Sequence, residues 1–122
     1  MIKTIAFLKR KPGLSHEDFV RYYETRHAPL ILSIAPQICD YRRNFLVREG
    51  AIVAPGAAEP DFDVVTELWY PDAAAFAAAM AAFTDPENAR RIAEDEANVF
   101  DRAHTRFYTV DERTSATALR LI

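Results

Sequence analysis

The sequence has one cysteine, Cys39, and only 3 glycines in 122 residues. A lone cysteine excludes an intrachain disulfide, so nothing in the sequence indicates an oxidising compartment. No segment approaches the roughly 20 consecutive apolar residues that a membrane-spanning helix needs. At the N-terminus a short apolar stretch precedes the basic residues, which is the reverse of a secretory signal. These absences predict a cytoplasmic protein without a membrane segment.

An excess of positive charge is also missing. The chain has 15 Lys and Arg against 18 Asp and Glu, a formal net charge of −3, whereas nucleic-acid binding needs a concentrated basic face. There is no glycine-rich phosphate loop. The three histidines, His16, His27 and His104, are too scattered to predict a zinc site. The sequence therefore predicts no nucleic-acid partner, no metal and no cofactor.

Half of the residues are hydrophobic, and their spacing indicates an α+β domain. Alternating apolar residues predict four strands, at 2–9, 38–47, 63–70 and 105–110. Capping signals predict helices that begin at Ser15, Asp72 and Asp85. The order β-α-β-β-α-β is typical of a ferredoxin-like fold, with helices on one face of a four-stranded antiparallel sheet. We expect a domain over residues 1–112, a tail over 113–122 and a long loop over 49–60.

Apolar residues occupy both faces of the predicted first and third strands, although the helices can cover only one face. Ala6 and Leu8 lie on one side of the first strand, whereas Ile5 and Phe7 lie on the other. A second copy of the sheet is the simplest cover for the bare face. We therefore expect a homodimer in which the two sheets face each other.

His27 is the first candidate for chemistry. It follows Tyr23 by four residues on the sheet-facing stripe of the first helix, and Pro29 should kink or break that helix near it. An imidazole titrates near neutrality, so His27 can act as an acid or a base. The alternative is a buried histidine that donates a hydrogen bond to a backbone carbonyl.

Strands two and three supply further candidates on shared faces. Tyr41 can donate a hydrogen bond to a substrate oxygen, and Arg43 on the same face can hold an enolate or a carboxylate. Alternatively, Tyr41 lies at the edge of the core and Arg43 forms a surface salt bridge. Glu67 is expected to be solvated, functional or, preferably, paired with Arg43 or Arg106, and Trp69 to be core or pocket wall. The acidic run around residues 94–101 is interpreted as a solvated helix face.

Several of these segments resemble a known family. The segment F-x-x-Y-Y-x-x-x-H-A-P-L from Phe19 to Leu30, with residues 9–15 before it, is similar to the signature of the EthD family in the dimeric α/β-barrel superfamily. Residues 41–44, 63–70 and 95–101 also fit, and the likeness covers residues 1–112. The resemblance implies a ferredoxin-like protomer, a barrel of two facing sheets and cofactor-independent chemistry. In the family's muconolactone methyl isomerase branch, a histidine and a tyrosine at the positions of His27 and Tyr41 line the pocket.

The resemblance and the residues together predict a cofactor-independent lyase or isomerase, of cyclase or dehydratase type, for a small cyclic or polyketide-like carbonyl compound. His27 would shuttle a proton and Tyr41 would hold the developing oxyanion. Further contacts to a hydrophobic substrate are assigned to Phe7, Tyr23, Arg43, Glu67 and Trp69, with Phe7 and Trp69 as pocket walls.

Two alternatives remain at this point. One is a non-catalytic accessory protein of a degradation pathway that binds a small molecule, and the other is a monooxygenase-like enzyme. The isomerase branch uses a loop histidine and a cysteine on the third strand, and this sequence has neither. Their absence favours the non-catalytic alternative over the isomerase activity.

Overall fold

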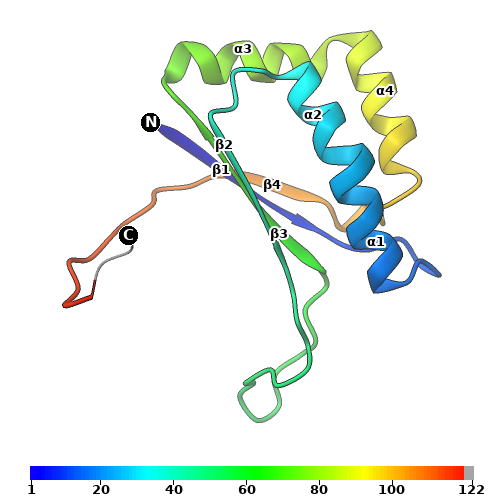
Figure 1. Ribbon diagram of the computed structural model, residues 1–122, viewed down its shortest axis with the longest axis vertical. Coiled ribbons are helices and arrows are strands. Elements are labelled where there is room, and N and C mark those ends of the chain that lie inside the picture. The colour runs from blue at the N-terminus through cyan, green and yellow to red at the C-terminus, as the bar shows by residue number, and fades with distance from the viewer. Residues whose placement is uncertain (120–122) are drawn as a thin grey trace.

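The computed structural model describes residues 1–119, which form one four-stranded antiparallel sheet covered by helices (Figure 1). The strands lie in the order β2-β3-β1-β4. They are β1 (Ile2–Leu8), β2 (Asp40–Phe45), β3 (Val64–Tyr70) and β4 (Arg106–Thr109). The helices are α1 (His16–Tyr22), the π-helix η1 (Tyr23–His27), α2 (Ala28–Ile34), α3 (Ala73–Thr84), α4 (Pro86–Glu96) and the 3-10 turn η2 (Arg102–His104). The predicted element order and fold class are confirmed.

The helices begin where their capping residues indicate. In each cap, a side-chain oxygen accepts a hydrogen bond from the backbone N–H three residues further on. The donor–acceptor distances are 3.1 Å for Ser15, 2.8 Å for Asp72 and 3.2 Å for Asp85. Each bond satisfies one of the amides that the first turn of a helix leaves free. These local bonds therefore set where α1, α3 and α4 start.

The first helical unit widens in its middle instead of breaking. Pro29 has no N–H to donate to the carbonyl of Thr25, and its ring would collide with that carbonyl in a regular α-helix. The chain forms the π-helix η1 just before it, with the N–H of Ala28 bonded to the carbonyl of Tyr23. Tyr23 and His27, at the two ends of η1, are both buried. The wider turn, which often occurs at functional sites, keeps His27 on the inner side of the helix.

The sheet has one covered and one open face. On the central strands the residues that point to the helices are buried: Thr4, Ala6 and Leu8 of β1, and Val64, Thr66, Leu68 and Tyr70 of β3. The intervening residues are half-buried and lie on the open face. Helix packing thus covers only one of the two apolar faces that the sequence predicts.

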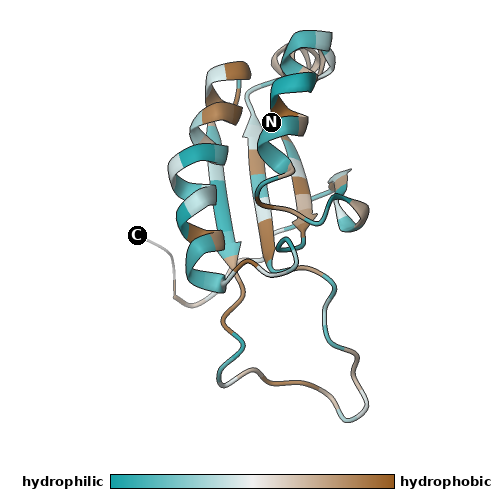
Figure 2. Ribbon diagram, turned by 90° about the vertical axis from the view of Figure 1, so that its right-hand side faces the viewer, coloured by the Kyte–Doolittle hydropathy of each residue, from teal (hydrophilic) through white to brown (hydrophobic). Residues whose placement is uncertain are grey.

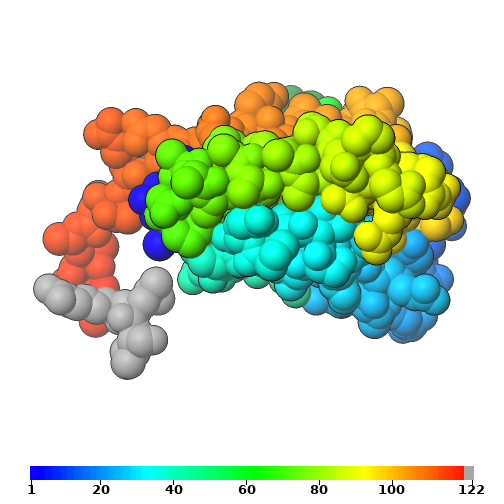
Figure 3. All heavy atoms as spheres, turned by 90° about the horizontal axis from the view of Figure 1, so that it is seen from above, coloured from blue at the N-terminus to red at the C-terminus, as the bar shows by residue number. Residues whose placement is uncertain are grey.

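Two segments extend from this body. The long loop expected at residues 49–60 is part of a longer segment, residues 46–63, which has no helix or strand and reaches beyond the end of the sheet (Figure 2). The expected tail at 113–122 is described as far as residue 119, has no helix or strand there, and leads away from the body (Figure 3); its last three residues lie outside the described part. No helix within residues 1–119 combines the length and apolar character needed to cross a membrane.

Candidate active site

A cavity of about 270 Å³ lies between the sheet and the helices. It occurs where the two clusters of buried core residues meet, since its lining includes members of both clusters. Its floor consists of Ala6 and Leu8 from β1 and of Thr66 and Leu68 from β3. Ala6 lies directly opposite Thr66 in the register of the two strands. Because both side chains are small, the centre of the sheet leaves room for a ligand.

The walls of the cavity are mostly apolar, and its mouth opens on one side. Ile31 from α2, Phe83 from α3 and Ile92 from α4 form the apolar walls. The exposed members of the lining are Ala89, Arg102, Thr105 and Phe107. The mouth therefore lies between the start of α4, the turn η2 and the edge strand β4. Such a hollow, apolar with a few polar groups, is typical of small-molecule sites.

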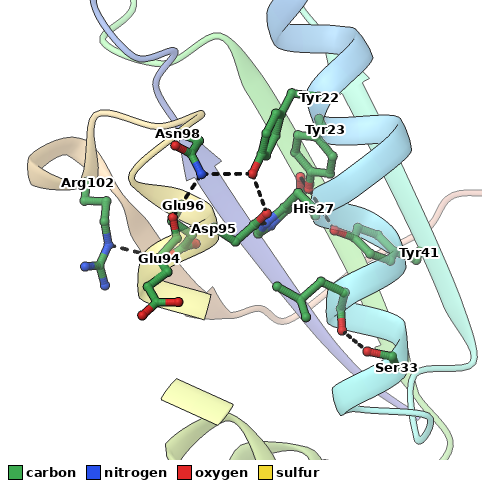
Figure 4. A network of polar contacts seen from close by, with 12 residues as sticks. Tyr22, Tyr23, His27, Ser33, Tyr41, Glu94, Asp95, Glu96, Asn98 and Arg102 are labelled. Carbon is green, nitrogen blue, oxygen red and sulfur yellow. Dashed lines mark hydrogen bonds and ion pairs between the residues drawn. The ribbon is translucent and has the colours of Figure 1, made fainter. Parts of the chain in front are cut away.

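His27 lines this cavity and is held by a carboxylate behind it (Figure 4). The residue is 4% exposed, and its Nδ1 lies 2.6 Å from Oδ2 of Asp95. An ionised carboxylate only accepts hydrogen bonds, so Nδ1 is the protonated nitrogen. Among the described residues, Nε2 has no hydrogen-bond partner. The pair thus presents an imidazole whose free lone pair is on Nε2, which is the arrangement of a general base.

Asp95 and His27 are fixed by further contacts. The Tyr22 hydroxyl donates to the second carboxylate oxygen of Asp95 at 2.9 Å, and the Asn98 amide donates to the Tyr22 oxygen at 3.2 Å. The His27 ring packs edge-on against Tyr23 and Phe100, with ring centroids 4.9 Å apart in both pairs. His27 is therefore buried, as the alternative interpretation had it, but its hydrogen-bond partner is a carboxylate and not a backbone carbonyl.

A chain of three hydroxyl groups forms another side of the cavity. The Tyr23 hydroxyl oxygen lies 2.6 Å from the hydroxyl oxygen of Thr66 and 3.0 Å from that of Tyr41. All three residues line the cavity. Burial raises the pKa of Tyr23 to about 12 and, with the neighbouring Tyr23, raises the pKa of Tyr41 as well. Both phenols therefore stay protonated at neutral pH and can act as hydrogen-bond donors.

Glu96 adds a second ionisable group to the cavity lining. Its oxygen Oε1 lies 3.4 Å from Nε of Arg102, and its side chain is 14% exposed. Burial raises the pKa of Glu96, while the charge of Arg102, and that of His27 when its imidazole is protonated, act in the opposite direction. The glutamate therefore holds its proton more tightly than an exposed glutamate does.

Arg43 does not line the cavity, although Tyr41 on the same strand does. Its guanidinium donates two hydrogen bonds to the Glu24 carboxylate, at 3.0 and 2.7 Å, and one to the carbonyl of Tyr41 at 3.0 Å. It also lies 4.8 Å from the centroid of the Tyr41 ring. Arg43 therefore forms the salt bridge of the alternative interpretation, with Glu24, and lies outside the cavity, where it braces Tyr41.

Phe7, Glu67 and Trp69 lie on the opposite, open face of the sheet. The residues that flank them along β1 and β3 face the helices, and side chains alternate between the faces of a strand. Phe7 and Trp69 therefore do not wall the cavity that His27 lines. Glu67 forms the expected ion pair, but with Lys3 at 2.7 Å. Apolar residues occupy both faces of these strands in the sequence, so the pattern alone could not predict which face lines the cavity.

Sequence reasoning missed Asp95 and Glu96, because the acidic run was interpreted as solvated, and it did not consider Arg102. One signal was available in the spacing. Ala89, Ile92 and Glu96 follow each other by three and four residues, and all three line the cavity. Residues with that spacing share a helix face, so the apolar stripe of α4 leads directly to Glu96.

The described part of the chain contains no group of three or more His, Cys, Asp and Glu side chains placed to hold a metal ion. The polar groups of the cavity are instead an imidazole, a carboxyl group, hydroxyl groups and, at the mouth, the guanidinium of Arg102. Together they can remove a proton, return a proton and stabilise negative charge on an oxygen.

The fold defines a ferredoxin-like α+β protein, and the sequence places it in a family. The EthD domain matches residues 11–103, so the chain belongs to the EthD domain family. An EthD-like protein from Ralstonia eutropha is 26% identical, with a TM-score of 0.54, and the match covers 82% of this chain and 81% of that one. No curated protein matches the chain.

Two more distant structures share the fold. A dimeric ferredoxin-like protein of unknown function from Thermobifida fusca is 17% identical, with a TM-score of 0.56, over 89% of this chain and 88% of that one. A hydroxynitrile lyase from Passiflora edulis is 16% identical, with a TM-score of 0.57, over 93% of this chain and 96% of that one. At these identities the likeness concerns the fold alone.

Proposed function

We propose that the protein is a cofactor-independent lyase or isomerase, of cyclase or dehydratase type, that moves a proton next to the carbonyl group of a small cyclic or polyketide-like compound. One observation carries the proposal: the imidazole of His27, held through Nδ1 by Asp95, shares a cavity with the phenol of Tyr41. Membership of the EthD family and the fold shared with a lyase are consistent with it.

In the proposed step, Nε2 of His27 takes a proton from the carbon next to the carbonyl group. The electron pair of that bond moves onto the carbonyl oxygen, and the Tyr41 hydroxyl donates a hydrogen bond to the oxyanion. Tyr41 can donate outward because Tyr23 can donate to its oxygen, and Thr66 can donate to Tyr23 in turn. A chain of hydrogen bonds polarises each member, which strengthens the last donor.

The size and lining of the cavity indicate the kind of substrate. Its volume of about 270 Å³ is just below the usual range for ligand pockets of about 300–1,000 Å³. The apolar walls of Ile31, Phe83 and Ile92 fit a flat hydrocarbon frame. We therefore propose a ligand of one or two rings with a single carbonyl group at the His27–Tyr41 end.

Exchange of α-protons in 2-tetralone, a two-ring ketone of this size, tests the proposal. The ketone is incubated with the protein in D2O, and the loss of the proton signal next to the carbonyl group is followed by NMR. We expect exchange to be faster with the protein than in buffer alone, and faster than with serum albumin at the same concentration. Binding without any acceleration would instead support a non-catalytic binding protein.

Replacing Tyr41 with phenylalanine removes the oxyanion donor and keeps the ring. We expect the rate of 2-tetralone exchange to fall by about 10² to 10³, the usual effect of losing one such donor. Tyr108→Phe is the matched control, because Tyr108 lies on the open face and contacts Phe7. An unchanged rate in Tyr41→Phe would show that the phenol does not hold the oxyanion.

The open face of the sheet supports a second part of the proposal, that the protein forms a homodimer. This face carries half-buried Ile5, Phe7 and Trp69, together with Tyr108, which is 52% exposed. A face with this much apolar surface is typical of an interface, and the Thermobifida fusca protein of the same fold is dimeric. We infer that a second copy of the chain covers the face.

Substituting Tyr108 with glutamate tests the dimer. An unpaired charge in the interface is expected to weaken the dimer at least roughly 30-fold, for a cost of about 2 kcal/mol or more. Sedimentation equilibrium measures the change. Leu32→Glu, on the outer side of α2 and 41% exposed, is the control and should leave the dimer intact. A monomeric wild-type protein would contradict the inference.

A further inference from the structure

Glu96 is the second ionisable side chain of the His27 cavity, and it belongs to a different element. It ends α4, whereas His27 ends η1. The neighbouring Asp95 is bonded to His27 and Tyr22, so the two adjacent carboxyl groups have different surroundings (Figure 4). We infer that Glu96 is a catalytic acid, which gives a proton to the group leaving the substrate while His27 removes a proton. This inference rests on the proposed function, because it needs a carbonyl substrate in the cavity.

The surroundings of Glu96 favour a group that carries a proton. The charged groups near it are Asp95 on its own helix, His27 on η1 and Arg102 on η2. The other helices packed against α4, α2 and α3, carry no charged side chain. Burial is the largest influence and raises the pKa of the Glu96 carboxyl group. Two carboxyl groups that are adjacent in sequence can therefore take different roles, one orienting the base and the other supplying the acid.

A dehydration shows how the two groups would share the work. Nε2 of His27 takes the proton from the carbon next to the carbonyl group, and the electron pair of that bond forms a carbon–carbon double bond. The bond from the β-carbon to its hydroxyl oxygen breaks, and the Glu96 proton joins the departing hydroxide, so water leaves. His27 is left as imidazolium and Glu96 as carboxylate. Transfer of the proton from His27 to Glu96, through water in the cavity, restores both groups.

Arg102 fits this cycle as a positioning residue. Its Nε lies 3.4 Å from the Glu96 oxygen, on the side of the cavity mouth. The guanidinium therefore stabilises the carboxylate that remains after the proton has left, and it lowers the pKa of Glu96 against the effect of burial. Without Arg102, Glu96 would hold its proton up to a higher pH.

Two ketones distinguish this inference from the proposed function. Exchange of α-protons in 2-tetralone needs only the base, whereas conversion of 3-hydroxy-1-tetralone to 1-naphthol and water also needs a proton for the leaving hydroxyl group. We expect the ratio of the dehydration rate to the exchange rate to be about a hundredfold lower in Glu96→Gln than in the wild-type protein. Glu94→Gln, two residues earlier and paired with Arg90 at the surface, is the control and should change neither rate.

The dependence of the dehydration rate on pH gives a readout that a purely structural role would not change. In the wild-type protein the rate should decline as rising pH deprotonates Glu96, and this decline should be absent in Glu96→Gln. Arg102→Gln should move the decline to higher pH, because the charge that lowers the pKa of Glu96 is gone. Circular dichroism spectra identify any variant that has not folded.

Each outcome bears on one claim. If the wild-type protein does not accelerate exchange of 2-tetralone, the proposed function fails. If it accelerates exchange and dehydration, but Glu96→Gln lowers both rates equally or neither, the proposed function stands and the assignment of Glu96 as the acid is wrong. If the dehydration rate of Arg102→Gln declines at the same pH as that of the wild-type protein, the role given to Arg102 is wrong.

Discussion

Glutamine in place of His27 is expected to lower the rate of 2-tetralone exchange by about 10² to 10⁴, which is the usual contribution of a general base. Glutamine is similar in length and can still hydrogen-bond to Asp95, but it has no lone pair basic enough to remove a proton from carbon. The fold should survive, because the surrounding rings of Tyr23 and Phe100 remain in place. Proton NMR in D2O measures the rate.

His104→Gln is the matched control for this change. His104 lies on η2 and faces Asp101, with Nδ1 at 3.2 Å from its carboxylate, so it also pairs with an acidic residue but does not line the cavity. We expect exchange at the wild-type rate in His104→Gln. Comparable rates in His27→Gln and the wild-type protein would show that another group is the base, and the mechanism proposed for the cavity would be abandoned.

Asparagine in place of Asp95 is expected to reduce exchange by a comparable factor, about 10² to 10⁴. The asparagine amide can turn its NH2 group toward Nδ1 of His27, which makes Nδ1 an acceptor and puts the proton on Nε2. The imidazole then has no free lone pair toward the cavity, although it keeps its position. The loss would come from the wrong tautomer rather than from a missing ring.

Nitrogen-15 NMR of the imidazole tests that explanation directly. In the wild-type protein the spectrum of the neutral imidazole should show the proton on Nδ1, which faces the Asp95 carboxylate at 2.6 Å. In Asp95→Asn the spectrum should show the proton on Nε2. A fall in rate without a change of tautomer would mean that the charge of Asp95, and not its hydrogen bond, supports catalysis.

The carboxylate behind His27 also explains why a buried histidine is tolerated at this position. A buried polar ring is costly unless it has a partner, and Asp95 provides one while leaving the other nitrogen for the cavity. Tyr22, next to Tyr23 in the chain, donates to the same carboxylate. The consecutive tyrosines therefore have separate tasks: Tyr22 holds Asp95, and Tyr23 supports Tyr41.

Local signals in the sequence were enough to determine the elements of the fold and to identify two of the residues that line the cavity, His27 and Tyr41. Capping residues such as Ser15, Asp72 and Asp85 act within one turn, and strand alternation depends only on neighbouring residues. The same holds for Pro29, whose missing N–H disturbs the helix next to His27. Tyr41 was identified by its position on strand two, and together with His27 it lines the cavity.

Only the tertiary structure decided which groups surround His27. Asp95 is 68 residues away in the sequence, and it reaches the imidazole because α4 packs against η1. The same packing brings Glu96 to the cavity, and the choice of sheet face excludes Phe7 and Trp69 from it. A strand with apolar residues on both sides carries no local sign of which side the helices cover. Long-range packing alone settles that choice, because it depends on how separate elements meet and not on any one segment.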